Sequence, residues 1–312
     1  KAGEIIADDQ DVVLRPDWRS QAATLEVGLI PTGGHDVGDR MDARAATPGV
    51  VVDRAILART MPVDLSKAPP PPGTIYVPHA KGPITIDGVA NEGSWASAVT
   101  SPEFLTADGC PDPIGSAIAK MTWDEQYLYL YVSVIDSDIY SPCKQHDDSL
   151  WKYDDLEIFI DADGNRRGYV ELQVNPNNAT FDTWWATTRS APMDKSWDSG
   201  MVTAVKVRGT PDKAGDTDQG WDAEIAIPLA AVKGRDAAMH VRIPPQVGDR
   251  WHLNVVRVDW KNGMTAQPPA SSWNRITCSD FHALDRMLVA VFADESGSIV
   301  PRSAPAAVSS PR

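Results

Sequence analysis

The stretch WKYDDLEIFIDADG, residues 151 to 164, predicts a β-strand that ends in a tight turn. Three aliphatic residues alternate in it with acidic or aromatic ones, namely Leu156, Ile158 and Ile160 with Glu157, Phe159 and Asp161. Side chains in a strand point alternately to opposite faces, so one face of this strand is aliphatic. The Asp163-Gly164 pair supplies the residue with positive φ that a hairpin turn requires.

Similar short runs of β-prone residues extend in both directions from this strand. Runs of strand length, separated by Asp, Gly, Asn and Pro, are AKMTWD, YLYLYVSVID, YVELQVNP, MVTAVKVRG, GWDAEIAIPL and RWHLNVVRVDW. Many short strands with polar turns and little amphipathic helix predict an all-β protein, an antiparallel sandwich or barrel, over residues 79 to 293. Because their runs alternate in phase with a strand, the expected core residues are Leu130, Val132, Ile158, Ile160, Ile225 and Ile227.

Both ends of the chain differ from this middle region. Residues 1 to 78 show no sustained periodicity and end in the proline-rich KAPPPPG, residues 67 to 73, which favours a stiff polyproline II segment. Residues 294 to 312 are rich in Ser, Pro and Ala, a composition that buries too little surface to order itself. We expect the N-terminal arm to lie extended against other polypeptides, anchored by apolar stretches such as residues 50 to 52.

Composition argues against several classes of partner. The 312 residues carry a net charge of -14, which repels nucleic acid and anionic membrane surfaces. The longest apolar runs are too short to span a bilayer. The chain begins at Lys1, which suggests a removed leader and an exported protein.

The three cysteines allow two arrangements. Cys110 and Cys143 flank a predicted pair of strands, whereas Cys278 lies far away in the sequence. One disulfide between Cys110 and Cys143 with one buried thiol, and three reduced thiols, are equally open.

Seven segments of the middle region follow one another in a recognisable order. They are ITIDGVANEGSWASA, AKMTWDEQYLYLYVSVIDSDI, WKYDDLEIFIDADG, GYVELQVNP, GWDAEIAIPLAAV, GDRWHLNVVRVDW and SSWNRITCSDFHALDRMLVAVF. Together they resemble the family 9 carbohydrate-binding module, in register from about Ile84 to Phe292, and both ends of the chain lie outside the resemblance. The resemblance implies a jelly-roll-like β-sandwich, a periplasmic or extracellular location and no catalytic machinery.

The same resemblance implies a sugar site. Sugar-binding members clamp a terminal sugar between two Trp rings and bond its hydroxyls with charged or amide groups, and the matching positions here are Trp151, Glu157 and Trp273. Gln173 stands where such members carry Arg, and Gln cannot reproduce the fixed fork of donors that a guanidinium offers. The structural alternative is that both Trp rings are half-buried aromatics at the edge of the sandwich.

Calcium is a second candidate ligand for the acids. Asp161, Asp163 and Asn165 begin like a calcium loop, but an EF-hand requires Gly and Glu where Arg166 and Leu172 stand, so a hairpin turn is the better interpretation. The resemblance implies structural calcium elsewhere, and the candidate ligands are Asp87, Asp154 and Asp155.

Catalysis and a required cofactor are not expected. The sequence contains no G-x-S-x-G elbow, no H-E-x-x-H helix and no Gly-rich phosphate loop. A related class of sandwich binds haem through Met and His from facing strands, which would bring Met121 or Met201 beside His252. No spacing in the sequence indicates such a haem site.

Two functions remain open. The first is a structural or docking subunit whose arm binds neighbouring proteins in a membrane-attached assembly, such as a photosynthetic or respiratory electron-transfer complex, at the periphery of the membrane. The second is a carbohydrate-binding protein that recognises the ends of sugar chains. The long N-terminal arm with its apolar anchors favours the first function, because a sugar module fused to an enzyme needs only a flexible linker.

Overall fold

The computed structural model of the chain describes residues 71 to 299 except 108, 111 to 115, 189 to 192, 214, 262 to 268 and 277 to 279, together with three strands nearer the N-terminus. The chain divides into two compact units, Lys1–Pro71 and Pro72–Arg312. This division falls within the proline-rich stretch that was predicted as a linker. Most of the predicted C-terminal tail, from residue 300 onward, lies outside the described residues.

The described strands of the N-terminal unit form a small sheet. They are β1 (Ala22–Gly28), β2 (Val51–Asp53) and β3 (Ile56–Pro62), paired antiparallel in the order β1-β3-β2. These strands pair with one another, whereas the arm was expected to lie extended against other polypeptides. The pairing was not predicted, because β1 and β3 are distant in sequence and no local pattern in either strand indicates its partner. Docking of this arm on other proteins stays a prediction.

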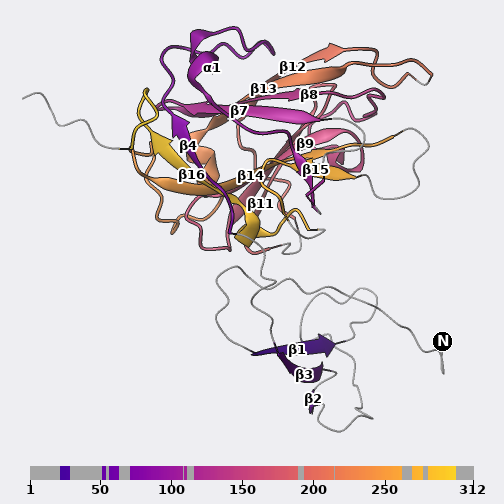
Figure 1. Cartoon of the computed structure of the whole chain (residues 1–312), viewed down its shortest axis with the longest axis vertical. Coiled ribbons are helices and arrows are strands. Elements are labelled where there is room, and N and C mark those ends of the chain that lie inside the picture. Colours follow the sequence, from indigo (N-terminus) through magenta and orange to yellow (C-terminus); the bar gives the residue numbers. More distant parts are fainter. Residues whose placement is uncertain are drawn as a thin grey trace, which may run out of the picture. The chain divides into compact units, whose positions relative to one another are not determined.

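The larger unit is a β-sandwich whose two sheets form two layers (Figure 1). The eight-stranded sheet has the order β11-β10-β9-β14-β15-β6, and β16 pairs with both β14 and β4. Its strands are β4 (Thr74–Pro78), β6 (Leu105–Thr106), β9 (Asp155–Asp161), β10 (Tyr169–Val174), β11 (Thr180–Trp185), β14 (Arg250–Val258), β15 (Ala270–Ser272) and β16 (Leu288–Ala293).

The five-stranded sheet has the order β12-β13-β8-β7-β5. Its strands are β5 (Val99–Thr100), β7 (Ala117–Trp123), β8 (Tyr127–Val134), β12 (Val202–Arg208) and β13 (Gly220–Pro228). The helices are short, namely α1 (Gly93–Ser97) and the 3-10 turns η3 (Leu150–Lys152), η4 (Leu229–Lys233) and η5 (Leu284–Arg286). Within the described part of the chain, no helix has the length and apolar character needed to cross a bilayer.

Strand pairing confirms the predicted all-β antiparallel sandwich. The two sheets are antiparallel apart from the parallel pair of β4 and β16. β4 begins at Thr74, so the sandwich starts earlier than the predicted residue 79, and the last part of the predicted arm is one of its strands.

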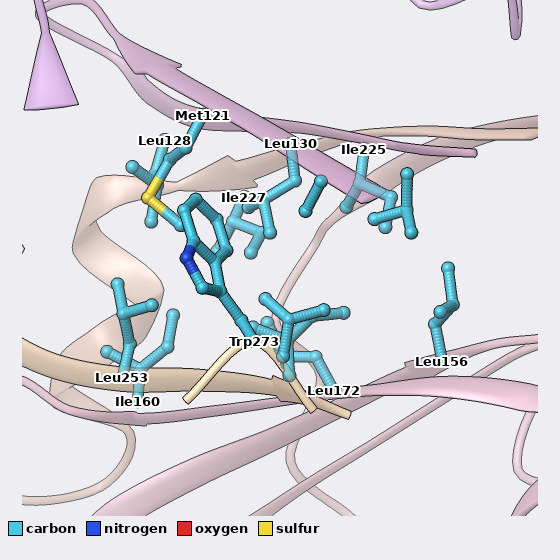
Figure 2. Close-up of a cluster of buried hydrophobic side chains, with 14 of the residues drawn as sticks. Met121, Leu128, Leu130, Leu156, Ile160, Leu172, Ile225, Ile227, Leu253 and Trp273 are labelled. Carbon is cyan, nitrogen blue, oxygen red and sulfur yellow. The ribbon is translucent and has the colours of Figure 1, made fainter. Parts of the chain in front are cut away.

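The core lies between the two sheets and contains the residues that alternation predicted. Leu130, Val132, Ile158, Ile160, Ile225 and Ile227 are all fully buried in one cluster. In Figure 2, Leu130 and Ile225 from the smaller sheet lie opposite Leu156 and Leu172 from the larger one. Burial of each such aliphatic side chain stabilises the fold by about 1.5–3 kcal/mol relative to exposure. The prediction of the core is confirmed.

The chain between β9 and β10 is a hairpin connection, as predicted. Gly164 has a φ of 65°, and a Cβ placed on it would lie 2.4 Å from the His252 ring. The Asp161 carboxylate accepts a hydrogen bond from the Arg166 amide at 2.9 Å, which closes the turn. Only glycine meets both conditions without strain, because it has no Cβ.

The predicted disulfide between Cys110 and Cys143 is not formed. Cys143 is a free cysteine, and its Sγ donates to the Ser149 carbonyl oxygen at 3.8 Å. Cys110 belongs instead to the turn after β6, where its amide donates to the Thr106 hydroxyl. The two cysteines flank β7 and β8 in sequence, but the loops that carry them are anchored to different parts of the fold. Cys278 lies outside the described residues.

Candidate functional site

A set of polar side chains lies on the face of the larger sheet that points away from the core. Glu157 on β9 pairs directly with Gln173 on β10, which pairs with Phe181 on β11. Directly paired residues share a face, and the neighbours two positions along each strand share it too. We call the four polar members of this surface the acidic face: Asp155, Glu157, Glu171 and Gln173.

Hydrogen bonds and rings hold Glu171 in place at the centre of this arrangement. Its carboxylate accepts from Gln173 Nε2 at 2.6 Å and from Trp185 Nε1 at 2.8 Å. The Tyr169 ring stacks on Trp185 with centroids 6.1 Å apart, and its hydroxyl hydrogen bonds to His282 Nδ1 at 2.5 Å. Neither Trp185 nor His282 was predicted as a site residue, although Trp185 on β11 pairs directly with Tyr169, which lies on the same face as Glu171.

Two members of the acidic face have hydrogen-bonding capacity that is not used. Asp155 is fully buried, and among the described residues neither of its carboxyl oxygens has a hydrogen-bond partner; the same holds for Gln173 Oε1. Burial, then the nearby charges of Glu157 and Glu171, raise the pKa of Asp155 well above its usual range. A buried polar atom without a partner costs about 1–3 kcal/mol, so a ligand that offers donors to these oxygens would gain free energy here.

Apolar side chains cover part of the same surface. Phe159 and Val256, which lie beside Glu171 and Glu157 in the sheet, pack in one cluster with Ile276, Leu284 and Met287. Met287 follows η5, which contains Leu284, and both residues are buried. The acidic face is therefore shielded from solvent in this structure, and Glu157, Glu171 and Gln173 are all buried.

Trp151 lies at the edge of the acidic face. It belongs to η3 and is half-buried, with its ring 5.2 Å from Phe181 in an edge-on contact. Lys195 Nζ lies 5.3 Å from the centre of the Trp151 ring. Since Phe181 pairs directly with Gln173, the structure brings together three of the four residues implied as the sugar site: Trp151, Glu157 and Gln173.

Trp273 lies elsewhere. It is 6% exposed and belongs to the main core, where its ring points between the sheets toward Met121 and Leu128 (Figure 2). The cause is strand phase. Ser272 pairs with Val256, which shares its face with Glu157, so the next residue turns to the opposite face. Neither the sugar clamp nor the alternative of a half-buried ring at the edge describes Trp273, because its ring is buried in the main core and is not at the acidic face.

The three candidate calcium ligands are not brought together. Asp154 is buried beside Asp136 and Asp259, and Arg257 Nη2 lies 3.3 Å from Asp136 Oδ2 and 2.8 Å from Asp259 Oδ2. Burial, then the Asp136 charge, raise the pKa of Asp154 well above its usual range. The single guanidinium of Arg257 faces three carboxyl groups, so it balances only part of the negative charge that this cluster can carry.

The other two candidates lie apart from that cluster. Asp155 faces the outer surface described above, since it pairs with Val258 in the same phase as Glu157 with Val256. The Asp87 backbone amide donates to Glu224 on β13, in the other sheet. Calcium binding by Asp87, Asp154 or Asp155 stays a prediction, and of these three residues only Asp154 lies in a group of acids close enough to share one ion.

The ligands considered for haem lie on opposite sides of the larger sheet. Met121 is buried in the core between the sheets, and Met201 packs against that core. His252 pairs with Asp161 on the other face, where burial lowers its pKa. The structure therefore does not place either Met beside His252.

Comparison with known proteins identifies the sandwich. A model of the family described as carbohydrate family 9 binding domain-like matches residues 86–282, which is more than half of the chain. A family 9 carbohydrate-binding module from Caldicellulosiruptor kristjanssonii, solved in complex with cellotriose, superposes with a TM-score of 0.50 at 18% identity. This superposition covers 74% of this chain and 100% of that one, and at such low identity it shows a shared fold.

Two curated relatives match part of the chain. A protein of Arthroderma benhamiae named extracellular protein is 25% identical over 170 residues, which are 51% of this chain and 65% of that protein. Endo-1,4-beta-xylanase A of Thermotoga maritima is 31% identical over 142 residues, which are 43% of this chain and 13% of the xylanase. The chain thus spans less than two thirds of the length of either relative.

Proposed function

Since this chain belongs to the carbohydrate family 9 binding domain-like family, we propose that it is a non-catalytic protein that binds carbohydrate at the acidic face, beside Trp151. The observation that carries the proposal is the convergence of a half-buried Trp with buried oxygens that have unused hydrogen-bonding capacity. Sugars present both an apolar ring face and several hydroxyl donors, so they match a Trp ring next to carboxylate and amide oxygens.

Gln173 gives this site a different character from one that contains Arg. Its amide already donates to Glu171, which leaves its carbonyl oxygen to accept a hydrogen bond. With Asp155 and Glu157 beside it, the face offers mostly acceptors. It therefore suits hydroxyl donors and disfavours acidic sugars, whose carboxylates would meet like charges.

Access to the acidic face requires movement of the side chains that cover it. Leu284 and Met287 contact this surface through apolar side chains, but the same cluster includes Tyr169, whose hydroxyl is hydrogen-bonded to His282, so opening near His282 would also have to replace that hydrogen bond. Opening exposes apolar surface, which costs free energy, and a bound sugar ring that stacks on aromatic side chains would offset part of it.

Carbohydrate binding replaces docking to a membrane-attached complex as the main function. The family match and the solved family 9 module in complex with cellotriose support carbohydrate binding over an electron-transfer role. We also propose that the protein acts outside the cytoplasm. The relative named extracellular protein supports this location.

Isothermal titration of the full chain with soluble cello- and xylo-oligosaccharides tests the proposal. We expect heat of binding for at least one of these sugars, and a loss of affinity of about tenfold or more in Trp151→Ala, because tenfold corresponds to about 1.4 kcal/mol. Gln173→Leu, which keeps the volume but removes both the unused acceptor and the donor to Glu171, should also weaken binding. The control is Tyr76→Ala, which removes an aromatic residue that is 48% exposed on β4. Equal affinity in Trp151→Ala and the parent chain would refute this location of the site.

A further inference from the structure

A second cluster of side chains lies beside β11, outside the acidic face. His146, Asp147 and Asp182 each offer one ligand atom, and these three atoms all lie within 4.8 Å of one another. His146 and Asp147 come from the loop that leads to η3, and Asp182 comes from the middle of β11. The His146 side chain is 46% exposed, so an ion can reach the cluster from solvent.

Asp182 provides the evidence that the cluster is more than a group of surface acids. It is 1% exposed, and only one of its oxygens is used: Oδ2 accepts from the Ser199 amide at 2.8 Å and from the Ser199 hydroxyl at 2.5 Å. Oδ1 is buried and has no hydrogen-bond partner among the described residues. Asp147 Oδ1 is likewise buried and without a hydrogen bond there. Each of these two carboxylates therefore has an oxygen whose acceptor capacity is available to a bound cation.

His146 is oriented as a metal ligand requires. Its Nδ1 lies 3.0 Å from Thr180 Oγ1, and its Nε2 lies 3.6 Å from Asp147 Oδ1. When Nδ1 donates to the hydroxyl, Nε2 presents its lone pair toward Asp147, and such a hydrogen bond on the second nitrogen is usual for metal-bound His. A tetrahedral ion with bonds of about 2.0–2.1 Å separates two of its ligands by about 3.3 Å, close to the distance observed.

The backbone holds the two halves of the cluster together before any ion binds. The Asp147 amide donates to the Thr180 carbonyl oxygen at 2.9 Å, which fixes the loop against β11 two residues before Asp182. A neighbouring cation is Lys195, whose Nζ lies 3.5 Å from the Asp147 carbonyl oxygen. Asp198 adds a further negative charge near Asp182, which favours a cation there.

We propose that His146, Asp147 and Asp182 bind a divalent metal ion of the zinc or manganese class. One imidazole and two carboxylates form a mixed nitrogen and oxygen donor set, which suits zinc and its neighbours better than calcium, because calcium prefers six to eight oxygen ligands. The remaining coordination positions would be filled by water, since the His146 side of the cluster is open. This site does not depend on carbohydrate binding, because none of its residues belongs to the acidic face.

Titration of the chelator-treated full chain with zinc chloride, and separately with manganese and calcium chloride, tests the proposal. We expect one zinc or manganese ion per chain, and a loss of affinity of at least tenfold in both His146→Gln and Asp182→Asn. The matched controls are His240→Gln, at an exposed His, and Asp198→Asn, which removes a nearby exposed charge but no ligand. Both controls should bind like the parent chain.

Two measurements keep the result decisive. Asp182→Asn alters an interaction with Ser199 and could unfold the chain, so His146→Gln, at an exposed position, carries the test if that variant fails. Zinc at one hundred times its dissociation constant should raise the melting temperature of the parent chain but not that of His146→Gln. Zinc and manganese heats that are absent, or unchanged in His146→Gln, would overturn the proposal, as would binding of calcium alone.

Discussion

Replacement of Trp273 by Ala separates a core residue from a sugar-binding one. The ring is 6% exposed and lies among Met121 and Leu128 in the main core (Figure 2). Truncation of a buried Trp to Ala costs about 3–5 kcal/mol, because the buried area and the packing contacts are both lost. Against a total stability of about 5–15 kcal/mol for a typical domain, this is a large fraction.

The size of the effect can be read in two independent assays. At about 2–4 °C per kcal/mol for a domain of this length, the melting temperature of Trp273→Ala should fall by roughly 6 to 20 °C. Trp151→Ala should lower stability less, on the order of 1 kcal/mol, because its ring is only half-buried. Urea unfolding followed by circular dichroism gives the free energies, and titration with oligosaccharide gives the affinities of the same variants.

Trp273→Ala should therefore lose stability, whereas Trp151→Ala should keep most of its stability and lose affinity for the sugar. Trp273→Phe, which keeps an aromatic ring in the core, should recover part of the stability and bind sugar like the parent chain. If Trp273→Ala instead keeps its stability within about 1 kcal/mol and loses sugar binding, the ring stacks on the ligand and its assignment to the core is wrong.

Two further outcomes are expected. The pKa of Asp161 is raised to about 7, chiefly by burial, so the folded chain holds this proton more tightly than the unfolded chain. The contribution of Asp161 to stability is therefore fully present below the unfolded pKa of 3.8 and is lost as pH rises through about 7. Unfolding curves from pH 4 to 7 should show a smaller fall in Asp161→Asn than in the exposed control Asp198→Asn, and parallel curves would contradict this origin. A chain truncated to begin at Gly73 should melt as one folded unit, whereas a chain that begins at His79 loses β4 and its parallel pairing with β16, so it should melt lower; equal melting temperatures would contradict the place of β4 in the sandwich.

The sequence by itself determined the features of this protein that depend on neighbouring residues. Alternation placed Ile158 and Ile160 in the core, because the two faces of a strand follow from a period of two residues. Asp163-Gly164 determined the hairpin connection, because only Gly adopts the required φ at low cost. The order of seven such local patterns was enough to indicate the family.

The tertiary structure alone decided which distant residues meet and which face each one takes. Trp273 turns into the core because of how β15 pairs with β14, and no local pattern reveals that phase. Cys143 has no bridge to Cys110 because their loops are anchored at different places. His146 and Asp182 become neighbours only when the loop before η3 is bound to β11, and the physical reason is the same in all three cases: strand register joins segments that are far apart in sequence.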